Sequence, residues 1–384
     1  MKAFWVYRML LAFLVFSVWG RSEAQTLTWL GTLPGNNPSY AFALSTDGSV
    51  VVGMAHNASN HWRAFRWTSG GGMQNLGTLG GVYSYGLGAS ADGSVVVGWS
   101  NDSSGRQRAI RWTSGGGMQD LGTLGGAHSY ASAVSANGLM VVGGANNASG
   151  AWRAFLWTSG GGMQDLGTLP GGSWSYAYGV SADGSVVAGR ANNAGGQQRA
   201  FRWTSGGGMQ DLGTLPGGSW SYAYGVSADG SAVVGWADIA GGQQRAFRWT
   251  SGGGMQDLGT LPGYNSFLGI GVSANGSVVV GRADNASYTA AFRWTPGGGM
   301  EDLNFAYASL LANGSWLYGA YSISPNGRYI VGNGYNAATG RFEAYLLDTL
   351  VVPEPASWLL FSAGLVGFLR LRRVKPSYRC LSRQ

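Results

Sequence analysis

Few residues of this chain are of types that carry out reactions by themselves. There are 3 histidines, His56, His61 and His128, and 1 cysteine, Cys380. The histidines lie in variable segments, without the spacing that metal ligands or a nucleophile and its base would need. The sequence therefore predicts no catalytic residue, no metal site and no bound cofactor.

The acidic residues raise two further possibilities, calcium binding and cleavage of a glycosidic bond. An Asp-Gly-Ser triplet recurs, but each copy offers one carboxylate, whereas Ca²⁺ takes about six to eight oxygen ligands. Acids outside the repeated positions are scarce, the most notable being Glu301, Asp302 and Glu343. An enzyme must gather its catalytic groups into one site. We therefore expect a protein that is not an enzyme, and keep a polysaccharide lyase or hydrolase as a less favoured alternative.

Tyrosine and tryptophan residues form the stronger functional signal. They recur before, or at the start of, the same expected strand: Tyr40, Tyr83, Tyr85, Tyr130, Trp174, Tyr176, Tyr178, Trp220, Tyr222, Tyr224 and Tyr264. Aromatic rings that carry a polar group suit the apolar faces of sugars. The candidate glycan contacts are Trp174, Tyr176, Trp220 and Tyr222. Packing between neighbouring repeat units is the other interpretation, and the sequence leaves both open.

Arginine and acidic residues also recur at a fixed distance. An arginine precedes an Asp or Asn by nine residues in five units: Arg66, Arg111, Arg202, Arg248 and Arg293 precede Asn75, Asp120, Asp211, Asp257 and Asp302. If the glycines between them form a hairpin tip, each arginine faces its partner across two antiparallel strands. We interpret the series as structural pairs rather than as a ring of ligand-binding charges.

These residues recur because the chain is built from repeats. Residues 157–185 and 203–231 are identical, and an (A/S)-(D/N)-G-x-x-V-x-G motif or a close variant recurs throughout. Successive turn residues are 45 to 51 positions apart, at Asp47, Asp92, Asn137, Asp183, Asp229, Asn275 and Asn326. This period matches a propeller blade. A β-solenoid coil is shorter, and a membrane barrel would need longer strands with a lipid-facing apolar band.

Each unit is expected to contain four antiparallel strands. In the fourth unit they are residues 175–181, 185–191, 199–204 and 209–215, joined by an Asp-Gly turn, a variable loop and a Gly-rich turn. Seven such units predict an all-β fold, a seven-bladed β-propeller of four-stranded blades.

The seventh unit lacks a fourth strand. It supplies strands at 315–324, 328–333 and 342–347, after which the pattern stops. The segment 27–33 (LTWLGTL) matches the fourth strand of a unit, but it lacks the other three strands of that unit. We expect this N-terminal strand to close the last blade, because an open ring would leave unpaired edges. The propeller should therefore span residues 25–350.

The net charge of +7 comes from the two ends of the chain. Between them, 15 arginines balance 15 acidic residues, so we expect no nucleic-acid partner. Residues 1–24 have a basic start, an apolar stretch and a Ser-Glu-Ala end, the pattern of a secretory signal. Signal peptidase should therefore cut between Ala24 and Gln25, and a short membrane anchor is the alternative.

The C-terminal end shows three unlike features in a fixed order. Pro353, Glu354 and Pro355 come first, an apolar run at 356–369 follows, and a basic cluster comes last, with Arg370, Arg372 and Arg373. As a helix the run would extend about 21 Å, short of a hydrocarbon core of about 30 Å. The basic cluster should stay on the cytoplasmic side. The run is therefore suited to a transient anchor in the inner membrane.

Two family resemblances follow from these motifs. Residues 351–375 closely resemble the PEP-CTERM sorting signal of Gram-negative bacteria, which an exosortase recognises and processes, although the tail 376–384 runs past its usual end. A plain C-terminal anchor is the alternative. The repeated RAFRWTSGGGMQDLGTL and its relatives resemble HAF-type extracellular repeats, with Arg-Ala-Phe where that family often has His-Ala-Phe. This second resemblance implies a secreted or surface-displayed repeat protein and no known reaction.

Together these features predict an exported, non-enzymatic repeat protein of a Gram-negative envelope. Signal peptidase and an exosortase would process it, and it would reach the cell surface or an exopolysaccharide-rich biofilm matrix. A lectin-like propeller that binds glycans through its aromatic residues is the main alternative.

Overall fold

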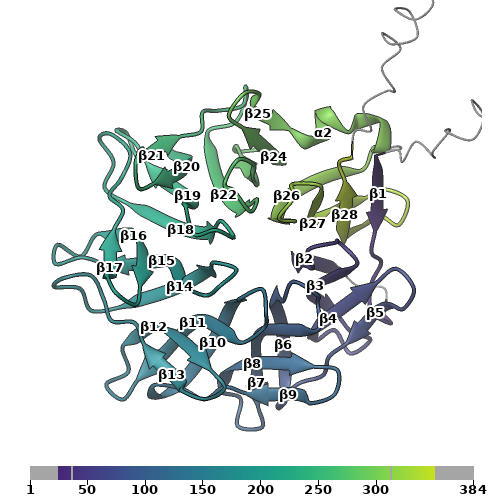
Figure 1. Ribbon diagram of the computed structural model, residues 1–384. Helices are drawn as coiled ribbons and strands as arrows, with labels where there is room; N and C mark the ends of the chain where they lie inside the picture. The colour runs from purple at the N-terminus through teal and green to yellow at the C-terminus, as the bar shows by residue number, and fades with distance from the viewer. Residues whose placement is uncertain (1–24, 36–37, 312–313, 351–384) are drawn as a thin grey trace, which may run out of the picture. The chain divides into compact units, whose positions relative to one another are not determined.

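Seven antiparallel sheets of four strands each are arranged around a central opening (Figure 1). The computed structural model describes residues 25–35, 38–311 and 314–350, and residues 26–349 form the unit that contains these sheets. The predicted all-β, seven-bladed propeller of four-stranded blades is confirmed. The predicted signal peptide up to Ala24, the sorting segment from residue 351 and the tail 376–384 lie outside the described residues.

The first six blades each take four successive strands, from the central opening outwards. Blades 1 to 3 contain β2 (Ser39–Leu44), β3 (Val50–His56), β4 (Trp62–Thr68), β5 (Gly72–Asn75), β6 (Gly80–Ala89), β7 (Val95–Asp102), β8 (Gln107–Thr113), β9 (Gly117–Asp120), β10 (Gly125–Val134), β11 (Met140–Asn147), β12 (Trp152–Thr158) and β13 (Gly162–Asp165). Blades 4 to 6 contain β14 (Ser175–Val180), β15 (Val186–Asn192), β16 (Gln198–Thr204), β17 (Gly208–Asp211), β18 (Ser221–Val226), β19 (Ala232–Asp238), β20 (Gln244–Thr250), β21 (Gly254–Asp257), β22 (Ser266–Val272), β23 (Val279–Asp284), β24 (Thr289–Thr295) and β25 (Gly299–Asp302).

The seventh blade combines the two ends of the propeller, as the sequence predicts. It contains β26 (Trp316–Ile323), β27 (Tyr329–Asn336), β28 (Arg341–Asp348) and, as its outer strand, β1 (Thr26–Trp29). In Figure 1 the purple β1 lies beside the yellow-green β28. The backbone N–H of Leu30 extends this pairing with a hydrogen bond of 2.9 Å to Ala344 O. Leu30 is 5% exposed and Leu33 2%, so this segment is anchored by burial as well as by strand pairing.

The apolar core lies between adjacent blades. One such cluster joins Val97 and Ala109 of blade 2 to Val141, Phe155 and Trp157 of blade 3. The equivalent third-strand position is 0% exposed in every blade, at Phe65, Ile110, Phe155, Phe201, Phe247, Phe292 and Tyr345. Since each blade buries its faces against its neighbours, the ring must close for the first and last blades to be equally covered.

The outer strands are shorter than expected. The sequence predicts 209–215 for blade 4, whereas β17 ends at Asp211. Beyond it the chain turns inward. Leu212 and Leu215 are 7% and 2% exposed and belong to the core between blades 4 and 5. Burial of two leucines contributes more than extra pairing of an exposed edge strand would.

The predicted pairing of arginine with acid across the third and fourth strands is wrong by one residue. In blade 2, Asp120 lies opposite Ile110, whereas Arg111 lies opposite Gln119. Neighbouring residues of a strand point to opposite faces, so Arg111 turns away from Asp120 and donates to Gly138 O in the next blade at 3.2 Å. The partner of Asp120 is Arg108, at 2.9 Å, and blades 3, 4 and 5 pair the equivalent residues: Arg153–Asp165, Arg199–Asp211 and Arg245–Asp257.

Two short helices separate the sixth blade from the seventh. They are α2 (Leu303–Ala306) and η1 (Ala308–Leu310), and Asp302 caps the first by accepting a hydrogen bond of 2.8 Å from the backbone N–H of Asn304. This insertion accounts for the longest interval between turns. It also gives Asp302 a structural role, consistent with the capping preference of aspartate.

Candidate functional site

Most of the predicted aromatic residues gather on one face of the propeller. Because the strands of a blade are antiparallel, the start of the first strand and the loop between the second and third strands lie at the same end. We call this end the aromatic face. It carries one tyrosine at the same first-strand position in each of blades 1 to 5: Tyr40, Tyr85, Tyr130, Tyr176 and Tyr222.

Rings on the aromatic face contact one another within and between blades. Tyr85 stacks on Trp99 of its own blade with centroids 4.1 Å apart, and Tyr222 stacks on Trp236 at 4.4 Å. Trp152 of blade 3 contacts Tyr176 of blade 4 at 5.5 Å. Of these three contacts, the one between Trp152 and Tyr176 is packing between neighbouring blades, and the other two are packing within a blade. Tyr176 and Trp152 are only partly buried, so part of each side chain remains accessible to solvent.

Three of the four candidate glycan contacts surround a single arginine. The guanidinium carbon of Arg190, on β15, lies 4.7 Å from the ring centre of Tyr222, 5.1 Å from Tyr176 and 5.8 Å from Trp174. These distances are within the range of cation–π attraction. Trp220, the fourth candidate, is 40% exposed and is not among the rings that face Arg190. The structure thus brings three candidates together and leaves one apart.

A cavity of about 510 Å³ opens beside this cluster. Its aromatic and cationic walls are Trp152, Trp174, Tyr176 and Arg190, and Ser173 and Gln198 add polar groups. Its volume falls within the range of about 300–1,000 Å³ that is typical of ligand sites. We call this cavity, with its six named residues, the Arg190 pocket.

Sequence reasoning missed Arg190 as a member of the site. It follows the glycine of the second-strand V-x-G motif, where the other blades carry a variety of residues: Met54, Trp99, Gly144, Trp236, Arg282 and Asn333. An alignment of the seven units at that glycine would have marked the position as the place where the repeats differ. The aromatic pattern alone could not, because arginine is not part of it.

The phenols beside Arg190 stay protonated at neutral pH. Burial raises the pKa of Tyr178 to about 12, and the nearby Arg190 charge opposes that effect. Burial likewise raises the pKa of Tyr176 and of Tyr222, again against the charge of Arg190. These phenols can therefore donate hydrogen bonds but cannot serve as bases near neutral pH.

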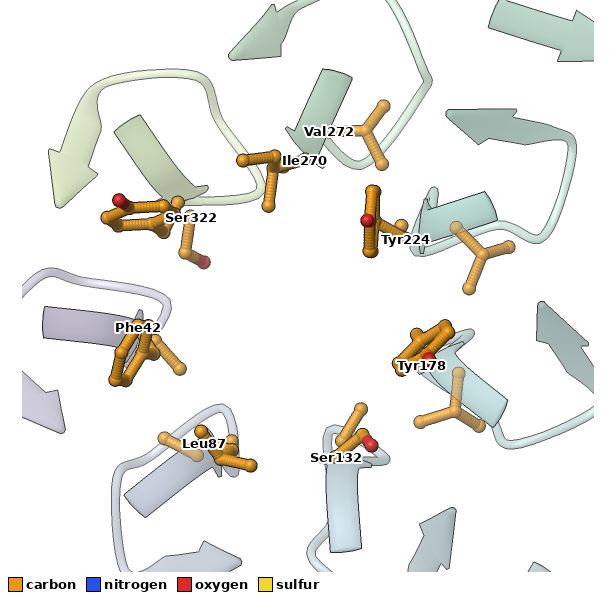
Figure 2. A pocket seen from close by; sticks show the side chains of 18 of the residues that line it. Phe42, Leu87, Ser132, Tyr178, Tyr224, Ile270, Val272 and Ser322 are labelled. Atoms are coloured by element: carbon orange, nitrogen blue, oxygen red, sulfur yellow. The ribbon is translucent and has the colours of Figure 1, made fainter. Parts of the chain in front are cut away.

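The central channel is lined mainly by apolar side chains. Figure 2 shows Phe42, Leu87, Tyr178, Tyr224 and Ile270 projecting into it from the first strands of different blades. Its volume is about 210 Å³. One further level of the channel is entirely aliphatic: Leu44, Ala89, Val134, Val180, Val226, Val272 and Ile323. These aliphatic side chains suit structural closure of the ring.

The histidines lie among aromatic rings and loop groups. His56 contacts Trp62 with centroids 3.6 Å apart, and its pKa is lowered by burial and by the neighbouring His61. His61 contacts the ring of Tyr83, and His128 Nδ1 accepts a hydrogen bond of 3.3 Å from the backbone N–H of Gln107. Within the described ranges, no group of three His, Cys, Asp or Glu is placed to hold a metal ion.

The acidic residues noted outside the repeated positions have protein partners. Glu301 forms an ion pair with Arg293. Glu343 is 2% exposed and accepts hydrogen bonds from Asn336 at 3.0 Å and Thr339 at 2.7 Å. A buried carboxylate with this many donors stabilises the local fold.

In the part of the chain that the structure describes, no helix is long and apolar enough to span a membrane.

One sequence family matches the chain, and it covers the C-terminal end. Residues 351–373 match the PEP-CTERM protein-sorting motif, so the predicted sorting motif, which contains Pro353 to Arg373, is confirmed by sequence. The match implies export and C-terminal sorting. The curated proteins contain no match to the chain.

Solved structures share the propeller fold. An oligogalacturonate lyase from Vibrio parahaemolyticus has a TM-score of 0.58 at 12% identity, over 85% of this chain and 94% of that one. An oligogalacturonate lyase in complex with manganese has a TM-score of 0.56 at 13% identity, over 85% and 93%. The β-propeller domain of the Trilobed protease from Pyrococcus furiosus has a TM-score of 0.53 at 9% identity, over 81% and 96%. At these identities the similarity is one of fold.

Proposed function

We propose that this chain is an exported envelope protein that displays a non-enzymatic HAF-type propeller at the cell surface or in the extracellular matrix. The observation that carries the proposal is the sorting motif at residues 351–373, placed after a propeller that is completed by its own N-terminal strand. Since β1 supplies the outer strand of blade 7, the propeller needs nothing from the chain beyond residue 350.

The order of processing follows from the charges and lengths of the two ends. Signal peptidase would remove residues 1–24 and expose Gln25. The apolar run at 356–369 and the arginines after it would then hold the protein in the inner membrane until an exosortase acts. A run too short for comfortable spanning suits an anchor that is removed.

Truncation after Leu350 tests this proposal in the native host. The truncated protein should fold, begin at Gln25 and accumulate in the periplasm, whereas the full chain should reach the surface or the matrix. Thermal unfolding of the two purified proteins is the control for folding, and their melting temperatures should agree. Surface display of the truncated protein in normal amount would contradict the proposal.

Glycan binding is the second candidate function, and the partly exposed aromatic residues of the Arg190 pocket favour it. Trp152, Trp174 and Tyr176 come from two blades and line one cavity. Flat apolar rings beside hydrogen-bonding groups match the alternating apolar faces and hydroxyls of sugars. An exopolysaccharide is the ligand expected for a protein displayed in such a matrix.

Replacing Trp174, Tyr176, Trp220 and Tyr222 together by alanine tests this candidate. A folded variant that is no longer retained on exopolysaccharide supports glycan stacking. A matched control is the double variant Tyr85→Ala and Trp99→Ala, which removes a stacked pair on blade 2 away from the Arg190 pocket and should keep binding. Each lost ring costs up to about 3 kcal/mol of stability by burial alone. A folded quadruple variant with unchanged retention would rule glycan stacking out at these residues.

A further inference from the structure

We propose that the Arg190 pocket selects acidic glycans, with the Arg190 guanidinium binding the carboxylate of a uronic acid. The inference rests on the proposed glycan binding and adds the charge class of the ligand. It comes from a comparison of equivalent residues in the blades.

Arg190 differs from the equivalent arginine of blade 6 in its partner. Arg282 occupies the same second-strand position, and its Nε lies 2.9 Å from Asp284 Oδ2, two residues further along β23. In blade 4 the residue two positions after Arg190 is Asn192. Among the described residues, Arg190 has no carboxylate within ion-pair distance, whereas Arg282 is neutralised by its own strand.

The side chain of Asn192 holds the segment with Ser173 and Trp174, which lines the Arg190 pocket. Its side-chain oxygen accepts hydrogen bonds from the backbone N–H groups of Ser173 and Trp174, at 2.8 and 2.9 Å. In blade 5, Asp238 makes the same two contacts, with Ser219 and Trp220, at 2.7 and 2.6 Å. Blade 4 thus keeps the anchored linker of blade 5 without its negative charge, and the positive charge of Arg190 remains available.

The guanidinium is held in place but not saturated with hydrogen bonds. Tyr176 and Tyr222 flank it from adjacent blades, and one of its nitrogens, Nη1, lies 3.4 Å from Gln198 Oε1. Its Nε is buried and has no hydrogen-bond partner. Since this Nε is shielded from solvent, a carboxylate in the cavity would accept hydrogen bonds from the terminal Nη groups of Arg190, which lines the cavity. Trp152 and Trp174 lie along the same cavity, where they can stack on the sugar rings.

The attraction would be local, because the propeller as a whole carries no excess charge. The 15 arginines between the two basic ends balance 15 acidic residues, so an acidic polymer is not drawn to the surface in general. Selection between acidic and neutral glycans must therefore depend on the Arg190 pocket itself. This makes the proposal testable with single substitutions.

Binding of two matched tetrasaccharides to the exported protein, measured by isothermal titration calorimetry, is the test. β-1,4-linked tetraglucuronate and cellotetraose differ only in the oxidation state of C6. Tetraglucuronate should bind more tightly by about tenfold or more, as expected for a charge-assisted hydrogen bond. Arg190→Gln should remove that difference, and Arg282→Gln, at the equivalent position of blade 6, should leave it unchanged.

A second variant separates loss of charge from loss of folding. Asn192→Asp places a carboxylate where blade 6 has one, and it keeps the acceptor that blade 5 uses to hold the linker. It should fold with a melting temperature close to that of the wild type and lose the preference for tetraglucuronate. If Arg190→Gln and Asn192→Asp both still bound tetraglucuronate more tightly than cellotetraose, the inference would be overturned. Equal binding of both sugars by the wild-type protein would overturn the charge selection but leave glycan binding standing, and binding of neither would refute both.

Discussion

Single glycines fix how closely the first and second strands of each blade approach. A Cβ atom added to Gly189 would lie 2.0 Å from Tyr176 O, and the equivalent distance for Gly53 to Tyr40 O is 1.9 Å. The first strand bulges at this level, where the pairing shifts between Ala177 and Gly179. Only glycine leaves room for the carbonyl oxygen there.

Gly189→Ala should therefore destabilise blade 4 strongly. We expect a loss of about 3 kcal/mol or more in the free energy of unfolding, the upper part of the range for overpacking. Gly206→Ala, in the hairpin turn of the same blade with nothing near the added carbon, is the control and should change it by less than about 0.5 kcal/mol. Chemical denaturation measures both, and equal values for the two variants would contradict this reading of Gly189.

Predictions about single residues succeeded where the repeat period alone sets the position of a residue. They failed where the pairing register of two strands sets its partner. The recurring tyrosines could be placed at the start of the first strands, because their spacing follows the blade. The partner of Asp120 could not, because a hairpin shifted by one residue replaces Arg111 by Arg108. Arg190 was missed because its importance lies in what surrounds it, four aromatic rings from two blades and, among the described residues, no carboxylate within ion-pair distance.

The Asp-Gly turns are the elements that join the blades on the face opposite the aromatic one. In blade 2, Asp92 Oδ1 accepts hydrogen bonds from Ser90 Oγ at 2.6 Å, from the backbone N–H of Ser94 at 3.0 Å and from Ser94 Oγ at 2.8 Å. Hydrogen bonds then connect the turns of neighbouring blades from blade 1 to blade 7, for example from the N–H of Thr46 to Ala91 O and from that of Ala91 to Ala136 O. The turns thus stabilise the ring as well as each hairpin.

These contacts predict how stability depends on pH. Hydrogen bonds from Ser90 and Ser94 lower the pKa of Asp92 to about 2. Its folded pKa is below the unfolded value, so its contribution is present above about pH 4 and is lost as the pH falls toward 2. Asp92→Asn keeps the acceptor, as Asn137 does in blade 3, and should lack this acid-dependent part. Melting curves between pH 5 and pH 2 measure the difference, and parallel losses in both proteins would contradict the assignment.

At the scale of the whole molecule, closure of the ring depends on eight residues at its N-terminal end. Removing residues 26–33 exposes the edge of β28 and uncovers the core that Leu30 and Leu33 share with Phe65 of blade 1. We expect a lower melting temperature and new proteolytic cleavage near β28, while blade 4 stays resistant. Limited proteolysis with mass spectrometry locates the cuts. Cleavage spread evenly over the blades would argue against a local closure.

The architecture could be predicted because each blade repeats the same sequence motifs. Seven turns set the number of blades, and a missing fourth strand together with an unassigned LTWLGTL segment required the ends to pair. The insertion of α2 and η1 could not be foreseen, since it occurs once and has no second copy to compare. The lengths of the outer strands were misjudged for a different reason. The leucines after them are buried by the next blade, a contact that no single unit reveals.

The proposal that this propeller is sorted by its C-terminal motif is tested most directly by changing Pro353 and Pro355 to alanine in the native host. These substitutions leave residues 26–349 untouched, so the propeller should fold as in the wild type. Cell fractionation with an antibody to the propeller then reports where the protein stops. We predict accumulation in the inner membrane with an uncleaved C-terminus and loss from the surface and matrix. Normal surface display of this variant, with the same C-terminal end as the wild-type protein, would contradict the account.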